Sequence, residues 1–238
     1  MRFLLGIIHE IAKRLSYPRR IDIHAISGWY HPRKGELICD IGCGDGYWDG
    51  RLARRKGTRF VGIDVNSEAV KKAKKFKQKA CTFVIADTHA LPFKSHIFDH
   101  AMSLSVLQFV KDDRKVLFEI KRVLKKEASI ILTCDSLSSK LLSHAYRKKH
   151  QKKYQTRRYY NLEQLATIMD EAGFEVIASR YAVCSVISIF LFMLQEWFGK
   201  IAYLGTPILL PLILVADKCM GSQTTGGYKL AVFARPKS

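Results

Sequence analysis

Apolar and polar positions alternate along most of this chain in a way that separates strand-like from helix-like segments. Two segments, residues 67–79 and 114–126, carry apolar side chains at helical spacing. A further helix is expected over residues 47–55. The helix that contains residues 114–126 is expected to begin at residues 106–110 and to continue through 112–126. Short apolar runs of strand length lie between them, at residues 37–41, 59–65, 81–87, 97–105, 128–134 and 228–235. This alternation predicts an α/β fold built as a three-layer sandwich.

The first apolar run leads into a loop that contains three glycines. These are Gly42, Gly44 and Gly46, and their spacing is G-x-G-x-G. Glycine permits backbone angles that are closed to other residues and lets a ligand approach the main chain closely. The usual dinucleotide fingerprint is G-x-G-x-x-G, and here Tyr47 stands in the place of its last glycine. With Asp40 just before it, the loop favours a ligand that has an amino-acid moiety and no phosphate.

Acidic residues also end the next two apolar runs. Asp64 ends the second run, and a carboxylate at the tip of the second strand is where a doubly wound fold holds two ribose hydroxyls. Asp87 ends the third run. Each aspartate taken alone is more often a helix cap or a turn residue. Three acidic strand tips in register are hard to explain in that way.

Together, these motifs resemble the class I S-adenosylmethionine-dependent methyltransferases of the small-molecule and lipid type. The resemblance rests on the glycine loop, the two acidic tips, Phe98-Asp99 followed by residues 105–110, and residues 160–165 with 171–176. It covers residues 36–182 and 228–237 in the family's order. It implies a Rossmann-like α/β/α sandwich with a seven-stranded, mostly parallel sheet whose last strand is antiparallel. The methyltransferase core would then be residues 35–182 and 228–238.

The resemblance also implies S-adenosylmethionine as cofactor, S-adenosylhomocysteine as product, and no metal. It assigns the methionine portion of the cofactor to the loop, at Asp40, Gly42, Cys43, Gly44 and Gly46. It assigns the ribose to the second strand tip, at Asp64 and Val65, and the adenine to the third, at Asp87 and Thr88. Backbone contacts are expected near the end of the fourth strand, at Ser103 and Leu104.

A general base is not identified by the sequence. An oxygen or carbon acceptor needs proton removal, whereas a neutral amine does not. The weak candidates near the expected mouth of the site are Tyr30, His31, His89 and Gln108. His89 could instead only turn the chain after the third strand, and Gln108 could only cap the site.

An apolar insert, residues 183–227, separates the sixth and seventh strands. Residues 182–194 and 201–216 carry no charge, yet each stretch is shorter than the ~20 residues that a membrane-spanning helix needs. Pro207 and Pro211 are expected to bend or break the second stretch. Strands six and seven are antiparallel neighbours in the family, so the insert must leave and re-enter on one side of the sheet. We therefore favour a monotopic helical hairpin in one leaflet over tilted short spans, a soluble lid or a dimer interface.

Residues 1–34 are expected to form amphipathic or cap helices. Leu4, Ile7, Ile8, Ile11 and Leu15 share one helical face, and charges interrupt the segment too often for a signal peptide. A helix in the lipid headgroup layer and a helix that packs over the site both fit this pattern.

The charge balance predicts an anionic partner. The chain has 40 Lys+Arg against 21 Asp+Glu, a formal net charge of +19. Basic residues crowd positions 140–158, interleaved with tyrosines, so that this stretch could contact anionic headgroups or stack on RNA bases. The six cysteines form no C-x-x-C pair, which predicts free thiols in a reducing compartment and no zinc site.

These expectations combine into one function. The basic stretch and the insert follow strands five and six, and ligands of an open parallel sheet bind outside the carboxyl ends of its strands. We therefore expect a cytoplasmic protein, peripheral or monotopic at the inner face of the membrane, that methylates a lipid or isoprenoid-type small molecule. The alternative is an RNA or protein methyltransferase that uses residues 140–158 for its substrate and the insert as a partner or homodimer interface. An inactive adaptor is disfavoured by the intact glycine loop and acidic tips.

Overall fold

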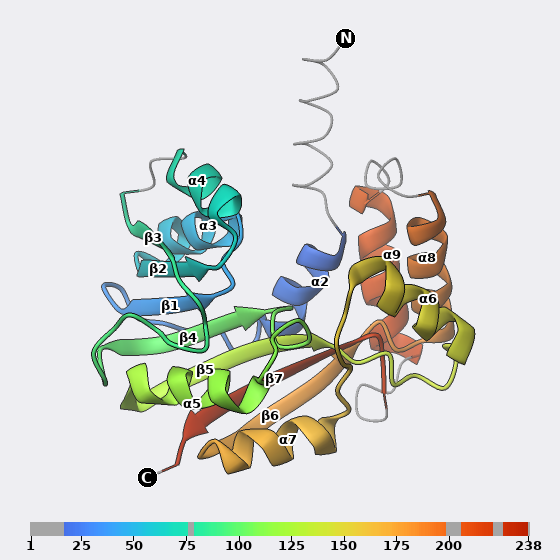
Figure 1. Cartoon of the computed structure of the whole chain (residues 1–238). Coiled ribbons are helices and arrows are strands. Elements are labelled where there is room, and N and C mark those ends of the chain that lie inside the picture. The colour runs from blue at the N-terminus through green and yellow to red at the C-terminus, as the bar shows by residue number, and fades with distance from the viewer. Residues whose placement is uncertain (1–16, 76–78, 199–205, 221–225, 238) are drawn as a thin grey trace.

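The computed structural model describes residues 17–75, 79–198, 206–220 and 226–237. A seven-stranded sheet forms its centre, in the order β3-β2-β1-β4-β5-β7-β6 (Figure 1). Six strands run parallel, and β7 is antiparallel to both β5 and β6. The fold class expected from the sequence is therefore confirmed. The strands are β1 (Leu37–Ile41), β2 (Arg59–Asp64), β3 (Cys81–Ile85), β4 (Phe98–Leu104), β5 (Leu124–Asp135), β6 (Phe174–Ala182) and β7 (Lys229–Pro236).

Helices cover both faces of this sheet (Figure 1). One layer contains α2 (Tyr17–Ile26), α3 (Tyr47–Lys56) and α4 (Ser67–Lys75), and the other contains α5 (Asp113–Val123) and α7 (Leu162–Glu171). Three more helices, α6 (His144–Tyr154), α8 (Val186–Phe198) and α9 (Thr206–Met220), gather at one end of the sheet. They follow the carboxyl ends of β5 and β6, which is the end where the site is expected.

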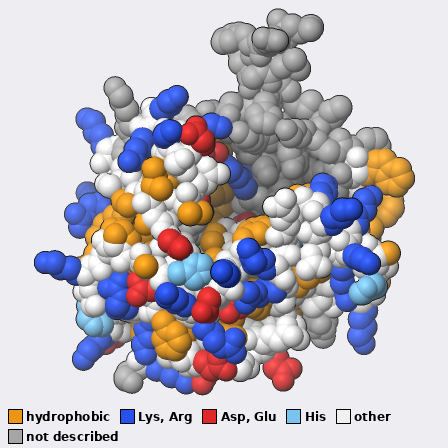
Figure 2. Space-filling view, viewed as in Figure 1, with side chains coloured by type: hydrophobic (Ala, Val, Ile, Leu, Met, Phe, Trp, Pro, Cys, Tyr) orange, Lys and Arg blue, Asp and Glu red, His pale blue; other side chains and the backbone are white. Residues whose placement is uncertain are grey.

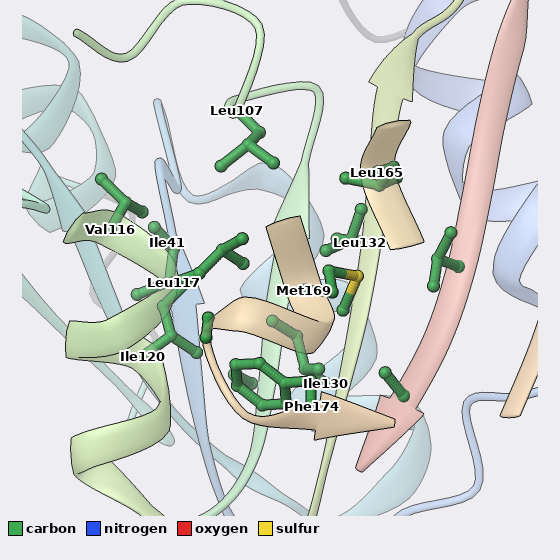
Figure 3. Close-up of a cluster of buried hydrophobic side chains, with 14 of the residues drawn as sticks. Ile41, Leu107, Val116, Leu117, Ile120, Ile130, Leu132, Leu165, Met169 and Phe174 are labelled. Carbon is green, nitrogen blue, oxygen red and sulfur yellow. The ribbon is translucent and has the colours of Figure 1, made fainter. Parts of the chain in front are cut away.

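The largest core cluster lies between the sheet and the α5–α7 layer (Figure 3). The apolar positions that predicted α5 all point into it, because they recur at helical spacing. Burying each such side chain fully contributes about 1.5–3 kcal/mol to stability. The side chains labelled in this cluster include Val116, Leu117 and Ile120 of α5, Leu165 and Met169 of α7, and Ile130 and Leu132 of β5.

The start of α5 differs from the sequence expectation. Residues 106–110 were expected to open this helix, but they form a turn that precedes it. The helix begins at Asp113 because the side chain of Asp112 caps it, accepting a hydrogen bond from the backbone N–H of Lys115 at 3.0 Å. The turn therefore stays outside the helix, next to the glycine loop.

The insert forms two helices, α8 and α9, whose tip (199–205) lies outside the described residues. The prolines were expected to bend or break the second half, and a break is wrong, because α9 continues through Pro211. Pro207 stands in the first turn, where the missing N–H has no intrahelical partner to lose. Across the described ranges, no helix combines the length and apolarity that crossing a bilayer requires.

One buried carboxylate fixes the base of this hairpin. Asp217 of α9 accepts hydrogen bonds from the backbone N–H groups of Val183, Cys184 and Ser185, which satisfies donors at the start of α8. It also holds Val183 at a φ of 56°, which is uncommon for a β-branched residue. The N–H of Tyr228 donates to the Val183 carbonyl at 3.1 Å, so the insert begins and ends at neighbouring residues.

At the N-terminal end, α2 packs on β5, β6 and β7. The predicted apolar face from Leu4 to Leu15 lies outside the described residues. Cys39, Cys43, Cys134 and Cys184 are free thiols, as expected.

Candidate functional site

Backbone hydrogen bonds fix the start of the glycine loop. Gly42, Gly44 and Gly46 all have positive φ, between 56° and 74°. The N–H groups of Gly42 and Cys43 both donate to the carbonyl of Ile63, at 2.7 and 2.9 Å, which fastens the loop to β2. A Cβ on Gly42 would lie 2.3 Å from Val106 Cγ2, whereas a Cβ on Gly44 would meet nothing within 4 Å. The loop is therefore packed at its first glycine and open to a ligand at its second.

The third glycine has a packing role. A Cβ on Gly46 would lie 2.4 Å from the ring of Phe83, so its absence lets the start of α3 approach β3. Gly46 does not line the cavity described next, although the sequence assigned it to the cofactor.

A cavity of about 270 Å³ lies beside the loop, outside the carboxyl ends of β1, β4 and β5. Six predicted site residues line it: Asp40, Gly42, Cys43, Gly44, Leu104 and Gln108. The rest of its wall comes from residues that the sequence analysis did not assign to the cofactor or to catalysis. These are Arg19, Asp22, Asp45, Tyr47, Trp48, Ser105, Phe109, Asp135, His150, Tyr154, Tyr228 and Lys229.

Asp64 stands at the tip of β2 with both carboxylate oxygens oriented. One oxygen accepts from the N–H of Gly44 and the other from the N–H of Asn66, each at 2.8 Å. The carboxylate therefore orders the open part of the loop and keeps lone pairs for further donors, such as the two hydroxyls of a ribose. Neighbouring Val65 is 72% exposed, which leaves an apolar surface beside that carboxylate.

The third strand tip is built differently. The Asp87 carboxylate accepts from the backbone N–H of His89 at 2.9 Å and bonds its ring Nδ1 at 2.6 Å. These two contacts lower the pKa of Asp87. His89 Nε2 in turn accepts from the backbone N–H of Asp112 at 3.1 Å, so both ring nitrogens are engaged. His89 thus ties the turn after β3 to the cap of α5, and buried Thr88 lies between it and Asp87.

Two proposed general bases do not line the cavity beside the glycine loop, which we call the donor cavity because the resemblance places the methyl donor there. Tyr30 and His31 line a second cavity, with His100 and Phe233. The expectation that they lie at the mouth of the site is therefore not met. His89 also lies outside the donor cavity's lining, and Ser103 is buried within β4. Of the four candidates, only Gln108 lines the donor cavity.

Gln108 presents a buried acceptor there. Its side chain is 1% exposed, and its Oε1 has no hydrogen-bond partner among the described residues. A buried polar atom without a partner is costly, which favours a ligand donor at this position.

Two buried aspartates lie under the loop. Burial, together with the charge of Asp49, raises the pKa of Asp40 well above its ordinary value. Burial also raises the pKa of Asp49, to about 7. A cationic amino group beside Asp40 would offset this unfavourable burial of negative charge. The two buried carboxyl groups, which we call the acidic floor of the cavity, therefore fit the ammonium group of an amino-acid moiety.

The opposite wall contains a buried ion-pair network that the sequence did not predict. Lys229 Nζ lies 2.6 Å from Asp135 and 3.6 Å from Asp22, and it also donates to Ser105 Oγ. Asp22 accepts from Ser105 Oγ at 2.9 Å and from Thr133 Oγ1 at 2.8 Å. Burial alone would lower the pKa of Lys229, but the charges of Asp135 and Asp22 raise it. Burial raises the pKa of Asp22 despite the nearby cation.

Helix α2 closes the cavity through two contacts. Arg19 pairs with Asp45 of the glycine loop at 3.0 Å, and Asp22, one turn further along, joins the network of Lys229. The N-terminal helix therefore bridges the loop and the opposite wall.

A third group of polar side chains surrounds His150. Its Nε2 lies 2.6 Å from the hydroxyl of Tyr228, and its Nδ1 lies 2.9 Å from the hydroxyl of Tyr159. If Tyr228 donates to Nε2 and Nδ1–H donates to Tyr159, the neutral ring can take up a proton that passes through the Tyr228 hydroxyl. Because Tyr228 and His150 both line the cavity, an acceptor O–H has a route for its proton.

The sequence comparisons agree with the motifs. The family model described as "Methyltransferase domain" matches residues 39–132. The chain is 31% identical over 152 residues to the malonyl-[acyl-carrier protein] O-methyltransferase of Hamiltonella defensa, covering 63% of this chain and 58% of that protein. It is 30% identical over 155 residues to the uncharacterized protein MJ1123 of Methanocaldococcus jannaschii, covering 64% of this chain and 71% of that protein. It is also 38% identical over 107 residues to the 2-phytyl-1,4-naphtoquinone methyltransferase of Nostoc punctiforme, covering 42% and 46%.

Solved structures share the fold. The putative methyltransferase in complex with the Haloferax volcanii Trm112 methyltransferase activator superimposes with a TM-score of 0.66 at 18% identity, covering 95% of this chain and 94% of that one. Phosphoethanolamine N-methyltransferase 2 of Haemonchus contortus, in complex with S-adenosyl-L-methionine, gives 0.66 at 20% identity, covering 91% and 52%. The chain belongs to the class I S-adenosylmethionine-dependent methyltransferases.

The residues at the loop fit this cofactor. The acidic floor at Asp40 suits the ammonium of its methionine, open Gly44 admits it to the backbone, and Asp64 can accept from its ribose. When bound, the cofactor supplies a methyl group activated by a sulfonium. Most of the acceleration can then come from positioning, because well-oriented groups reach effective molarities of about 10⁵–10⁸ M. Among the residues the structure describes, no cluster of three or more His, Cys, Asp or Glu side chains forms a candidate metal site.

Proposed function

We propose that this protein transfers the methyl group of S-adenosylmethionine to an amphiphilic acceptor drawn from a membrane, of the lipid or isoprenoid type. We further propose that it acts as a peripheral or monotopic protein at the cytoplasmic face of that membrane. The observation that carries this proposal is the exposed apolar surface of α8 and α9, which lies beside basic α6 at the donor end of the sheet.

The apolar surface is large for an ordinary protein exterior. On α9, Ile208 is 71% exposed, and Leu212 and Val215 continue the same outward stripe at helical spacing. On α8, Val186, Ile187, Phe190 and Trp197 are also exposed. Contiguous exposed apolar side chains of this kind mark a surface that contacts lipid or a partner.

The neighbouring charge favours an anionic lipid surface over a neutral partner. Helix α6 carries five cations and no acidic residue: Arg147, Lys148, Lys149, Lys152 and Lys153. Each cation close to an anionic membrane contributes about 1 kcal/mol to binding. Lys and Arg side chains lie over α6 beside apolar side chains at the α8 edge (Figure 2).

The named relatives support an amphiphilic acceptor. One of them is named for a naphthoquinone that carries a phytyl chain, which is an amphiphilic molecule. A structural neighbour is named for phosphoethanolamine, which resembles the polar headgroup of a lipid and has no apolar chain.

Vesicle flotation tests the membrane part of the proposal. The full chain is expected to float with vesicles that contain phosphatidylglycerol and to float less with vesicles of neutral phosphatidylcholine. Leu212→Asp should reduce flotation, because it places a charge on the outward stripe of α9. Phe118→Asp is the matched control, since Phe118 is exposed to a similar degree on α5, away from the hairpin.

The alternative is an RNA or protein methyltransferase whose hairpin binds a partner subunit. A structural neighbour in complex with an activator protein gives this alternative a specific basis. Equal flotation of wild type and Leu212→Asp, together with RNA binding that depends on the α6 lysines, would favour it and would contradict the lipid proposal.

A further inference from the structure

A third cavity, larger than the donor cavity, lies between α6 and α8. Its volume is about 640 Å³, against about 270 Å³ for the donor cavity. Helix α6 contributes Tyr146, Lys149, His150 and Lys153, and α8 contributes Phe190, Met193, Leu194 and Trp197. In both sets the residues follow the same helical spacing (i, i+3, i+4, i+7), so each helix turns one complete face toward the cavity. We call this cavity the α6–α8 groove.

The two helices do not close on each other along these faces. Phe190 is 63% exposed and Trp197 is 87% exposed, although both are large apolar side chains. The opposite face of α8 is the packed one, where Ile189 and Phe192 are buried in the core. A volume of this size is ordinary for a small-molecule site, which is concave and mostly apolar.

The walls of the groove differ in polarity. The described α8 residues that line the groove are all apolar, whereas the α6 wall places Lys149 and Lys153 one turn apart. Lysine stems can line an apolar ligand while their ammonium groups stay in solvent. This arrangement complements a molecule with one apolar chain and an anionic head. It does not complement an uncharged apolar molecule or a cationic amphiphile.

The groove meets the donor cavity at one residue. His150 lines both cavities, and its partner Tyr228 lines the donor cavity. Tyr154, which also lines the donor cavity, has its ring 4.8 Å from the Nζ of Lys153. A molecule in the groove therefore has one end beside the glycine-loop cavity.

We propose that the α6–α8 groove binds the apolar chain of an anionic amphiphile. The phosphate or carboxylate of this amphiphile contacts Lys149 and Lys153. The end of the amphiphile that accepts the methyl group extends past His150 into the donor cavity. The inference rests on the proposed function in taking this amphiphile to be the methyl acceptor. The binding itself is a property of the groove and can be measured without catalysis.

Calorimetry of the full chain with octyl, decyl and dodecyl phosphate, each below its micelle concentration, tests the groove. Affinity should rise with chain length, because each buried methylene contributes about 0.8 kcal/mol, or about fourfold in the dissociation constant. Dodecyltrimethylammonium, with the same chain and the opposite charge, should bind at least about tenfold more weakly than dodecyl phosphate.

Matched variants locate the site. Leu194→Asp places a charge in the apolar wall and should weaken dodecyl phosphate about tenfold or more. Leu212→Asp changes a similarly exposed leucine outside the groove and should change the affinity less than about twofold. Lys149→Glu with Lys153→Glu should remove the preference for the anionic head, whereas Lys148→Glu with Lys152→Glu, on the same helix, should keep it. Unchanged S-adenosylmethionine binding in every variant checks that the donor half is folded.

Several outcomes would overturn the inference. These are no binding, no dependence on chain length, equal losses in the groove and control variants, or a concentration-dependent dimer that Leu194→Asp abolishes. The last would make the groove a contact between copies of this chain. If the groove binds dodecyl phosphate as described but Leu212→Asp has no effect on flotation, the inference stands and the membrane proposal fails.

Discussion

The two halves of the site are built by different means. The donor half is a contiguous glycine loop between β1 and α3, and it is held by backbone hydrogen bonds and by one carboxylate, Asp64. The opposite wall of the cavity, which we call the acceptor half, is assembled from side chains of separate elements. These are Asp22 from α2, Asp135 from β5, His150 from α6 and Lys229 from β7. The donor half therefore depends on local conformation, whereas the acceptor half depends on the complete tertiary fold.

Substitutions in the two halves should therefore have different effects. A substitution in the donor half should reduce cofactor affinity and leave the fold largely intact. A substitution in the buried network of the acceptor half should reduce the stability of the whole protein, because it leaves a charge without its partner in the interior.

The largest expected effect is on the acceptor half. Lys229→Met removes the cation that separates Asp22 and Asp135, and breaking a buried ion pair from one side costs about 3–5 kcal/mol. Denaturant unfolding should show this loss, and adding Asp135→Asn to the same chain should recover part of it. Lys237→Met is the control, since Lys237 pairs with Asp170 at the surface. Equal stability of the two single variants would refute the role of the network.

The next effect concerns the donor half. Asp64→Ala removes the acceptor that orients the Gly44 N–H and the one expected for the ribose. Hydrogen bonds to a charged group contribute about 1.5–3 kcal/mol, so S-adenosylmethionine affinity should fall about 10- to 100-fold by calorimetry. Glu68→Ala, an exposed acid on neighbouring α4, should bind normally. An unchanged dissociation constant for Asp64→Ala would contradict the assignment.

A smaller effect should appear in the pH dependence of stability. Burial raises the pKa of Asp49 to about 7 in the folded protein, against an ordinary value of 3.8. The folded state therefore holds this proton more tightly than the unfolded chain. The stability that this proton contributes is complete below about pH 4 and is lost as the pH rises through about 7. Between about pH 6 and pH 8 the loss is about 1 kcal/mol, and Asp49→Asn should reduce it, while neighbouring Asp40, whose pKa is also raised, still contributes. Glu163→Gln, an exposed acid on α7, should leave the slope as in wild type. An unchanged slope in Asp49→Asn would show that this carboxyl titrates normally.

The smallest effect is expected where α2 joins the two halves. Arg19 and Asp45 form a partly exposed ion pair, and such pairs contribute about 0–1 kcal/mol. Arg19→Ala should therefore cost little stability, and the difference from wild type should shrink further as salt rises. A loss comparable to that of Lys229→Met would show that α2 is fixed mainly by this pair rather than by Asp22.

The sequence could predict the donor half because its signals are local. The glycine spacing, Asp40 and Asp64 all lie at the ends of short apolar runs. Six of the predicted residues line one cavity, whereas Asp64 and Asp87 at the next two strand tips lie outside its lining, so their contacts with the cofactor stay a prediction. Errors arose where local patterns are ambiguous. Residues 106–110 have helical composition but precede the cap at Asp112, and Pro211 does not end α9.

The acceptor half could not be predicted in the same way. Lys229 reaches Asp135 because β7 runs antiparallel to β5, so the first residue of β7 pairs with the last residue of β5. That pairing requires the strand order, which no single segment encodes. His150 stands in a run of lysines that has the composition of a solvated surface, and only its burial between Tyr159 and Tyr228 distinguishes it.

The position of β7 has a consequence for how this protein folds. Although it follows every other strand along the chain, β7 lies between β5 and β6 rather than at an edge of the sheet. Until it arrives, β5 presents an unpaired row of backbone donors and acceptors, and β6 has no neighbour. The pairing of β7 with β5 and β6 must therefore wait until the insert between β6 and β7 has been synthesised. A long-range step of this kind slows folding and leaves an intermediate with an open sheet edge that is prone to aggregate.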